Sequence, residues 1–345
     1  MSLNLVLIAA LVTRAAALSP ASTSAVSTAI ERCRVATQEG SKTFYFATNF
    51  MDRERAEAVW SIYAWCREVD EVADGPGFAS DDLRRAELER RRARLDATFG
   101  GGGGDAAESS TELALASACA RFALSKEPFN DMIDGMLMDL RAEGGAEGEG
   151  DGGRARVLYE TAEELDVYCY RVAGTVGLMT LPIVGGVDRA ADAETRARAR
   201  ALGEALQLTN ILRDVGEDAT ERGRVYLPRA HLARFGVGAD DIVAMSRGER
   251  PISDAYRRLV DFELARNLER YADGEAGVPL LPAATQLPVR VALELYREIA
   301  LSIVARNGHD NLTQRAFVGT WSKVRALPGI TARAVRAALA AGSRR

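Results

Sequence analysis

Histidine and cysteine, the residues most often found in metal sites and in nucleophilic catalysis, are scarce in this sequence. Its 345 residues include two histidines and four cysteines, which lie far apart and without metal-ligand spacing. A zinc site and a histidine-dependent catalytic triad are therefore excluded, and we expect the cysteines to be reduced and structural. Any metal in this protein would need carboxylate ligands, which suit Mg²⁺ or Mn²⁺.

The sequence also lacks an excess of positive charge and long hydrophobic runs. Its 44 Lys and Arg against 49 Asp and Glu give a net charge of −5, with no basic stripe. Nucleic acid is therefore excluded as a partner. The apolar stretch 3–12 is shorter than the roughly 20 residues that a membrane-spanning helix needs, and no later segment meets that requirement. We expect any contact with lipid to be peripheral.

Acidic residues are absent from the first 30 positions. This segment has one Arg and is rich in Ala, Ser and Thr, which is typical of a targeting peptide. We expect residues 1–30 to form a transit peptide and residues 31–345 to form one domain. A simply helical N-terminus is the alternative.

The remainder of the chain predicts an all-α fold. Apolar residues recur at helical spacing, and runs of β-branched residues bounded by turns are few. Glycine-rich stretches at 100–104 and 143–153 cannot hold a helix, and we expect them to be surface insertions. Long surface loops cost little additional closure entropy, so the helices on either side of each insertion can still belong to one bundle.

One apolar, aromatic segment carries an unexpected polar stripe. In "AVWSIYAWCREVDEVAD", the spacings 4, 3 and 4 place Tyr63, Arg67, Asp70 and Asp74 along one face of a helix. Burying two carboxylates without partners would be prohibitive, so cations must neutralise them or they must face a solvated cavity. A divalent cation with open positions for phosphate oxygens meets this requirement.

A second stripe follows in "LGEALQLTNILRDVGEDATERGRVYLP". It consists of Gln207, Asn210, Asp214 and Asp218. Arg213 and Arg224 add positive charge suited to diphosphate, which Arg can bind through two parallel hydrogen bonds. One such stripe is usually only a solvated helix face. Two stripes, each extended by an amide or an Arg, favour facing helices that hold a cluster of metal ions.

Two further motifs each leave a choice open. Gly174 and Gly177 lie within an apolar helical pattern, where each costs about 1 kcal/mol relative to alanine. They admit either a neighbouring helix or a long apolar ligand. In "SKTFYFAT", Ser41 and Lys42 could bind phosphate and the following rings could face an electron-deficient carbon. Such aromatic clusters are more often part of the core.

Together these motifs resemble the squalene/phytoene synthase family, and its plant and algal phytoene-forming branch in particular. The resemblance runs from about Ser41 to Val324. It is carried, in order, by "YAWCREVDEVADGP", "DMIDGMLMDL", "YCYRVAGTVGLM", "LTNILRDVGEDATERGRVYLP", "LELYREI" and "TQRAFV". It implies an all-α isoprenoid synthase bundle whose central apolar cavity is flanked by two aspartate-rich helices that bind Mg²⁺ and prenyl diphosphates.

The resemblance also implies roles for individual residues. The metal ligands would be Asp70, Asp74, Asn210, Asp214 and Asp218. The four aspartates, with Tyr63 and Arg67, would be catalytic. The diphosphate positions are Ser41, Lys42, Arg67, Arg213, Tyr296 and Arg315, and the cavity positions are Phe44, Tyr63, Tyr168, Val172, Val176 and Gly177. Gln207 would bind substrate beside the second set of aspartates. The segment "GTWSKVRAL" has fewer lysines than relatives carry, so diphosphate closure there is expected to differ.

The implied reaction is the head-to-head condensation of two geranylgeranyl diphosphates through a cyclopropyl diphosphate to phytoene. It releases two diphosphates and is the first committed step of carotenoid biosynthesis. The cofactor would be Mg²⁺ or Mn²⁺, without NADPH, and no protein base is nominated because released diphosphate can take the proton. The implied location is the plastid, in the stroma or peripherally on a membrane. A geranylgeranyl diphosphate synthase is the candidate protein partner.

Three alternatives stay open. Squalene synthase adds an NADPH-dependent reduction and usually a membrane-spanning tail, and this chain ends in "AAGSRR". Dehydrosqualene synthase uses the shorter farnesyl diphosphate, and a few cavity residues set that choice. A non-catalytic scaffold of the same fold is the alternative from another class, although all four aspartates are retained.

Overall fold

Polar side chains define where many of the helices begin. The structure, a computed structural model, describes residues 20–75, 77–100, 109–144 and 155–342. At seven helix starts the side chain of a Ser, Thr or Asp accepts a hydrogen bond from the backbone N–H three residues later. This bond satisfies one of the backbone donors left free at a helix N-terminus. Ser41 is the first of these caps.

The all-α prediction is confirmed. The first part of the chain forms α2 (Pro20–Gly40), α3 (Lys42–Thr48), α4 (Arg53–Asp74), α5 (Asp81–Phe99), α7 (Ser110–Arg121) and α8 (Glu127–Gly144). The middle forms α9 (Ala162–Cys169), the π-helical turn η1 (Tyr170–Gly174), α10 (Thr175–Ala191) and α11 (Ala193–Glu221). The last part forms α12 (Arg229–Phe235), α13 (Ala239–Ser246), α14 (Asp254–Gly277), the 3₁₀ turn η2 (Val278–Leu280), α15 (Ala283–Ala305) and α16 (Thr320–Gly342).

The two strands in the described part of the chain form a parallel ladder of two residues each. β1 (Arg156–Val157) pairs with β2 (Arg224–Val225), with Arg156 opposite Arg224. The ladder holds the segment that leads into α9 against the segment that leaves α11. It thereby fixes the chain directly after the second acidic stripe.

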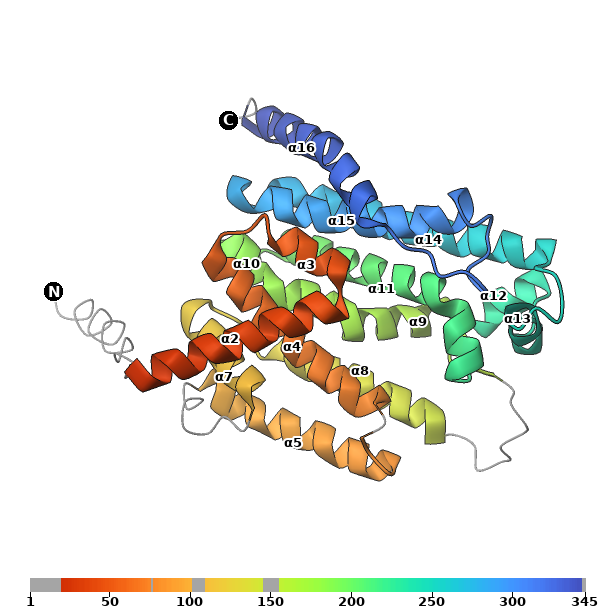
Figure 1. The fold of residues 1–345 in the computed structure, drawn as a ribbon, viewed down its shortest axis with the longest axis horizontal. Helices are drawn as coiled ribbons and strands as arrows, with labels where there is room; N and C mark the ends of the chain where they lie inside the picture. Colours follow the sequence, from red (N-terminus) through yellow and green to blue (C-terminus); the bar gives the residue numbers. More distant parts are fainter. Residues whose placement is uncertain (1–19, 76, 101–108, 145–154, 343–345) are drawn as a thin grey trace.

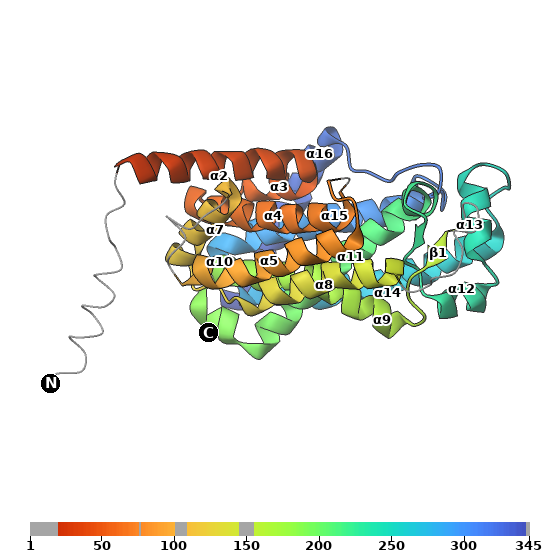
Figure 2. The same cartoon turned by 90° about the horizontal axis from the view of Figure 1, so that it is seen from below.

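Helix α11 is the centre of the bundle (Figure 1). It packs against α10, α14 and α15, while α4 and α8 pack against α10. Helix α2 lies across the outside of α3 and α4, as the second view shows (Figure 2). A large continuous hydrophobic core joins these helices and includes Trp65, Phe129 and Ile133. This arrangement places both acidic helices beside the same interior space.

The glycines at the start of α10 permit close helix packing. A Cβ on Gly177 would lie 2.3 Å from the carbonyl oxygen of Ala199, and a Cβ on Gly203 would lie 2.2 Å from that of Ala173. Backbone therefore meets backbone where α10 and η1 cross α11, and only glycine fits. Gly177 therefore lies against a neighbouring helix, and it also lines the cavity described below, so the two alternatives are compatible.

Helices α9 and α10 follow one another through η1, with a kink at Gly186, and include a long apolar stretch. By length and composition alone, Ala162–Ala191 qualifies as a membrane span. The expectation that no later segment meets that requirement is therefore wrong. However, 61% of its most apolar window is buried against the rest of the protein. Its hydrophobicity is therefore explained by its position in the core of the bundle.

The predicted N-terminal and glycine-rich segments lie mostly outside the described residues. Residues 1–19, 101–108 and 145–154 are in that category. Residues 20–30 of the expected transit peptide belong to α2, where Ala29 and Ile30 are buried. A cleavage site near Glu31 stays a prediction.

Candidate active site

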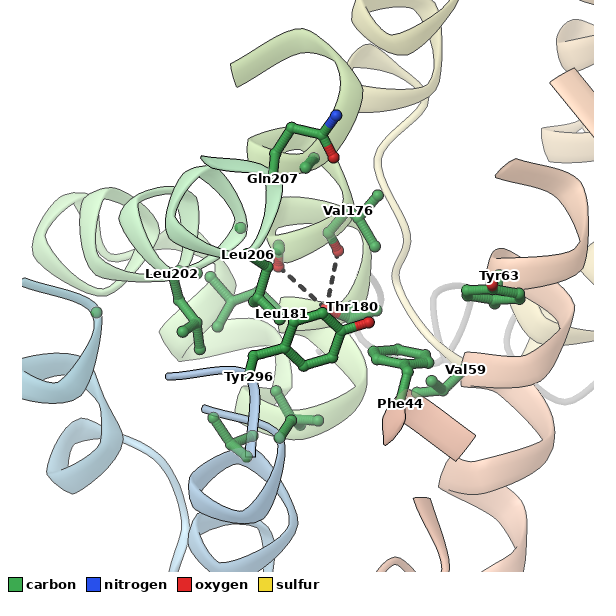
Figure 3. Close-up of a pocket in the computed structure, with 18 of the residues that line it drawn as sticks. Phe44, Val59, Tyr63, Val176, Thr180, Leu181, Leu202, Leu206, Gln207 and Tyr296 are labelled. Atoms are coloured by element: carbon green, nitrogen blue, oxygen red, sulfur yellow. Dashed lines mark hydrogen bonds between the residues drawn. The ribbon is translucent and has the colours of Figure 1, made fainter. Parts of the chain in front are cut away.

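An apolar cavity of about 330 Å³ opens inside the bundle. Several helices supply its walls. They are α4 through Val59, Tyr63, Cys66, Arg67 and Asp70; α10 with η1 through Val172, Val176, Thr180 and Val184; α11 through Thr195, Ala199, Leu202, Leu206 and Asn210; α15 through Val289, Ala292 and Tyr296; and α3, α8, α9 and α14 through Phe44, Met132, Tyr168 and Gly274. Figure 3 shows Phe44, Tyr63, Val176 and Tyr296 arranged around this space. The predicted central cavity is present.

The cavity is elongated and its two ends differ. Its lining on α11 extends from Thr195 to Asn210, which corresponds to about 22 Å at the rise of an α-helix. Asp70 and Asn210 lie at one end. At the other end Leu181, Val184 and Leu281 form a small apolar cluster. Such a cavity suits a long apolar chain with a polar head.

Most of the residues predicted for substrate binding line this cavity. They are Phe44, Tyr63, Arg67, Asp70, Tyr168, Val172, Val176, Gly177, Gln207, Asn210 and Tyr296. The remaining predicted residues lie outside the lining and are Ser41, Lys42, Asp74, Arg213, Asp214, Asp218 and Arg315. The cavity therefore comprises the predicted apolar positions and the near ends of both acidic stripes.

The two acidic stripes meet across one arginine. Arg222 Nη1 lies 3.8 Å from Asp74 Oδ2 on α4 and 3.3 Å from Asp218 Oδ1 on α11. Arg224 Nη1 donates a 2.9 Å hydrogen bond to Asp74 Oδ1. The stripes thus face a shared point of positive charge. The sequence predicted a role in diphosphate binding for Arg224, whereas Arg222 was not predicted as a site residue.

Other arginines hold the remaining aspartates. Arg67 Nη1 donates to Asp70 Oδ2 at 2.6 Å. Asp214 accepts from Arg213 Nε and from Arg315 Nε, each at 2.8 Å. Burial alone would raise the pKa of Asp214, but these two guanidinium groups hold that pKa below its ordinary value. Arg315 therefore joins α11 although it is 101 residues away in sequence.

Asp70 and Asp218 are short of positive charge. Burial, together with the nearby charge of Asp74, raises the pKa of Asp70 to about 6. Burial raises the pKa of Asp218 to about 7, although Arg222 opposes that shift. A further cation at this end of the cavity would stabilise both ionised carboxylates.

A divalent cation fits the donor set at this end. Within residues 20–342, apart from the segments not described, no three His, Cys, Asp or Glu side chains converge as a metal site. The oxygens of Asp70, Asp74, Asn210, Asp214 and Asp218 are nevertheless hard donors, which suit Mg²⁺ or Mn²⁺. The raised pKa values of Asp70 and Asp218 indicate an unmet need for positive charge there.

Basic and hydroxyl groups gather beside the cavity, near the N-terminus of α3. The hydroxyls of Ser41 and Tyr296 are hydrogen-bonded at 2.9 Å, and Tyr296 lines the cavity. Lys323 on α16 is buried, and burial together with the charge of Lys42 lowers its pKa. Lys323 lies in the "GTWSKVRAL" segment and was not predicted as a site residue. These groups are suited to an anionic head group.

A buried carboxyl group that was not predicted lies behind the cavity wall. Tyr168 Oη donates to Asp139 Oδ2 at 3.1 Å, and the rings of Tyr159, Tyr168 and Tyr226 pack together. Asp139 Oδ1 has no hydrogen-bond partner among the described side chains. Burial and the charge of Asp74 raise the pKa of Asp139 to about 8. In the sequence, the sign of this buried carboxyl group is one acidic residue within the apolar run "GMLMDL".

Asp139 is expected to make the fold less stable as the pH rises. Its folded-state pKa exceeds its ordinary value of 3.8, so its contribution is full below about pH 4 and is lost as pH rises to 8. Asp139→Asn removes this dependence and keeps an acceptor for Tyr168. With a chelator present, the free energy of unfolding of Asp139→Asn should therefore fall less steeply between pH 5 and 8 than that of the parent. The two slopes should differ by at most about 1.4 kcal/mol per pH unit.

Denaturant unfolding at several pH values measures this difference. Asp70 and Asp218 titrate in both proteins, so the difference between the curves reports Asp139 together with its charge interaction with Asp70. Asp134→Asn provides the reference, because that half-exposed carboxylate lies on the same helix and pairs with Arg92 instead. Parallel curves for the parent and Asp139→Asn would show that Asp139 is not a buried acid.

Comparison with known proteins agrees with this geometry. The squalene/phytoene synthase profile matches residues 37–322. A chloroplastic phytoene synthase of Arabidopsis thaliana is 41% identical over 92% of this chain and 69% of its own length. The 15-cis-phytoene synthase of Synechococcus elongatus is 39% identical over 88% of this chain and 92% of its own.

A solved structure shows the same architecture. A dehydrosqualene synthase crystallised with a ligand superposes with a TM-score of 0.72 at 29% identity, covering 89% of this chain and 97% of that one. The cavity, the paired acidic stripes and these similarities agree. The chain belongs to the squalene/phytoene synthase family.

Proposed function

We propose that this protein is a phytoene synthase that joins two molecules of geranylgeranyl diphosphate head to head. The observation that carries the proposal is the elongated apolar cavity with two acidic helix faces at one end. The names of the plant and cyanobacterial relatives support the same product. The cavity would hold the prenyl chains, and the charged end would hold their diphosphates.

The charged end binds and orients the diphosphates. Arg67, Arg213 and Arg315 present guanidinium groups, which match phosphate oxygens in pairs. Asp70, Asp74, Asn210, Asp214 and Asp218 would hold Mg²⁺ or Mn²⁺. When bound, the metal supplies Lewis-acid stabilisation of the departing diphosphate. The arginines that pair with these aspartates are then available to the anionic substrate.

The cavity walls protect the carbocations. Apolar side chains exclude water, which would quench an allylic cation before the second prenyl chain attacks it. The rings of Phe44 and Tyr63 stack with centroids 5.4 Å apart at the wall, and their faces stabilise positive charge on carbon. The second chain's double bond attacks the cation, and loss of a proton to the released diphosphate closes the ring of a cyclopropyl diphosphate. A second ionisation, rearrangement and proton loss then give phytoene.

A dehydrosqualene or squalene synthase is the second candidate. Its support is the superposition with a dehydrosqualene synthase, whose fold accommodates related chemistry. The two candidates differ in chain length, and squalene formation also requires NADPH. Purified protein incubated with Mg²⁺ and labelled C15 or C20 diphosphate, with and without NADPH, should form phytoene from C20 alone, independently of NADPH. A C15-derived product would favour the second candidate, and no released diphosphate would favour a scaffold.

The cellular setting follows from the same proposal. The protein would act in plastids, in the stroma or at a membrane surface, near the synthase that supplies geranylgeranyl diphosphate. We expect import to remove an N-terminal segment before about Glu31. Mass spectrometry of protein recovered from plastids would identify the mature N-terminus, and an intact Met1 would contradict this expectation.

A further inference from the structure

A charged side chain lines the apolar end of the cavity. Among the described residues that line the cavity, three carry charge, and two of these, Arg67 and Asp70, lie at the end with the acidic stripes. The third is Arg198 on α11, which is about 18 Å from Asn210 along the helix axis. An arginine therefore lines the cavity at the end where the proposed diphosphate chemistry requires no positive charge.

The guanidinium group of Arg198 is held toward solvent. Its Nη1 donates to Asp273 Oδ1 on α14 at 2.7 Å, and its Nη2 lies 3.8 Å from Glu194 Oε1, one turn earlier on α11. Both carboxylates are exposed, and the side chain of Arg198 is 32% exposed. The side chain therefore borders both the cavity and solvent, as long cationic side chains do at the edge of an apolar region.

Two glycines on α14 bring the backbone of that helix close to this part of α11. A Cβ on Gly277 would lie 2.5 Å from Arg198 Cβ, and a Cβ on Gly274 would lie 2.8 Å from Leu202 Cβ. Both glycines line the cavity, so α14 contributes no side chain there. Figure 3 shows Leu202, one turn after Arg198, across the cavity from Tyr63. The side chain of Arg198 therefore covers the wall that α14 leaves bare at Gly277.

The position of Arg198 limits the length of apolar chain that the cavity can bury. Ala199, the next residue, packs against the cluster of Leu181, Val184 and Leu281, which surrounds a chain end with apolar groups. A longer chain would have to lie against the ion-paired guanidinium group or pass it into water. In either case the added carbons would gain no burial. Because an exposed ion pair contributes little stability, the limit comes from this missing apolar contact.

We propose that Arg198 is a specificity-determining residue that sets the upper limit of the prenyl chain at C20. The inference rests on the proposed function, from which the C20 substrate is taken. The apolar cluster provides contacts for the end of a C20 chain, whereas Arg198 excludes the next isoprene unit. A C25 prenyl diphosphate should therefore be a poor substrate, with a kcat/KM roughly tenfold or more below that for C20.

Replacement of the arginine by an apolar residue should raise this limit. Arg198→Leu should increase kcat/KM for C25 diphosphate roughly tenfold or more and keep that for C20 close to the parental value, since apolar pockets discriminate by such factors per methylene. Asp273→Asn keeps the arginine but removes its partner, and it should increase C25 use by a smaller factor. Arg196→Leu is the matched control, because Arg196 bonds to the Ala190 carbonyl and does not line the cavity. Diphosphate release with Mg²⁺ provides the readout.

A labelling experiment locates the chain end without relying on turnover. Arg198→Cys places a thiol where the cavity meets solvent, and a charged methanethiosulfonate reagent should modify it. A C20 thiolodiphosphate with Mg²⁺, which binds in place of the substrate and ionises slowly, should protect that thiol. Peptide mass spectrometry separates it from the four native cysteines. Ala197→Cys, at an exposed position outside the cavity lining, should be labelled equally with and without the analogue.

Three results would overturn the role of Arg198. They are equal use of C25 and C20 by the parent, an unchanged ratio of C25 to C20 use in Arg198→Leu, and labelling of Arg198→Cys that the C20 analogue does not slow. Failure of the proposed function would give a different result. The parent would then form no phytoene from C20 diphosphate, although the analogue would still protect the thiol introduced by Arg198→Cys.

Discussion

Asp70→Asn and Asp214→Asn are each expected to reduce turnover about a thousandfold, since the loss of several kcal/mol of transition-state stabilisation has that effect on a rate. Each variant replaces an ionised oxygen donor by a neutral one of the same shape. Asp70 faces the cavity, and Asp214 lies on the second stripe between two arginines. Diphosphate release from the C20 substrate, measured over a range of Mg²⁺ concentrations, provides the readout.

Circular dichroism should show that both variants keep the helical fold. Asp166→Asn is the matched control, because Asp166 also pairs with two arginines, Arg266 and Arg270, and does not line the cavity. That control should keep parental turnover. Near-parental rates in both Asp70→Asn and Asp214→Asn would show that the stripes do not serve the chemistry, whatever the fold.

The stripes were predictable because helical spacing alone determines which side chains share a face. Asp70 and Asp74 on α4, and Asn210 to Asp218 on α11, follow directly from spacings of three and four. The expectation that the two faces oppose each other came from the presence of both stripes. Either stripe alone would leave unexplained charges on an apolar helix. The structure brings them to Arg222.

Contacts between distant segments could not be predicted in the same way. Arg315 reaches Asp214 from the segment before α16, and Lys323 on α16 is buried near enough to Lys42 for that charge to add to burial in lowering its pKa. Neither contact follows from a local period. Asp139 was missed because it is the one acid in the apolar run "GMLMDL" of α8, and its environment arises from the packing of Tyr159, Tyr168 and Tyr226.

The fold was predicted at the level of class, and its close packing was not. The sequence allowed two explanations for Gly177, and the structure shows that this glycine both packs against Ala199 on α11 and lines the cavity. Similarly, the apolar segment 162–191 becomes one long helical unit only when η1 joins α9 to α10. The helix propensities of the residues predict where helices form, whereas the contacts between helices depend on the shapes of the surfaces that meet.

Val184→Phe is expected to shift substrate preference from C20 toward C15 diphosphate. Val184 lines the cavity on the α10 stripe and packs with Leu181 and Leu281 at the end away from the aspartates. A ring there would occupy the space of the last isoprene unit and leave the charged end unchanged. The kcat/KM for C20 should fall roughly a hundredfold or more, with that for C15 retained, because apolar pockets discriminate chain length by steric exclusion.

Val187→Phe separates this effect from a general disturbance of α10. Val187 lies three residues further on, beyond the kink at Gly186; it is 64% exposed and does not line the cavity, so its ring should leave both rates unchanged. Thermal unfolding of both variants measures any cost of overpacking, which is typically about 1–3 kcal/mol in a closed core. Equal losses for C15 and C20 in Val184→Phe would mean that the far end of the cavity does not hold the end of the prenyl chain. A selective loss for C20 would instead assign the chain terminus to the cluster of Leu181, Val184 and Leu281, because only the longer substrate reaches that depth.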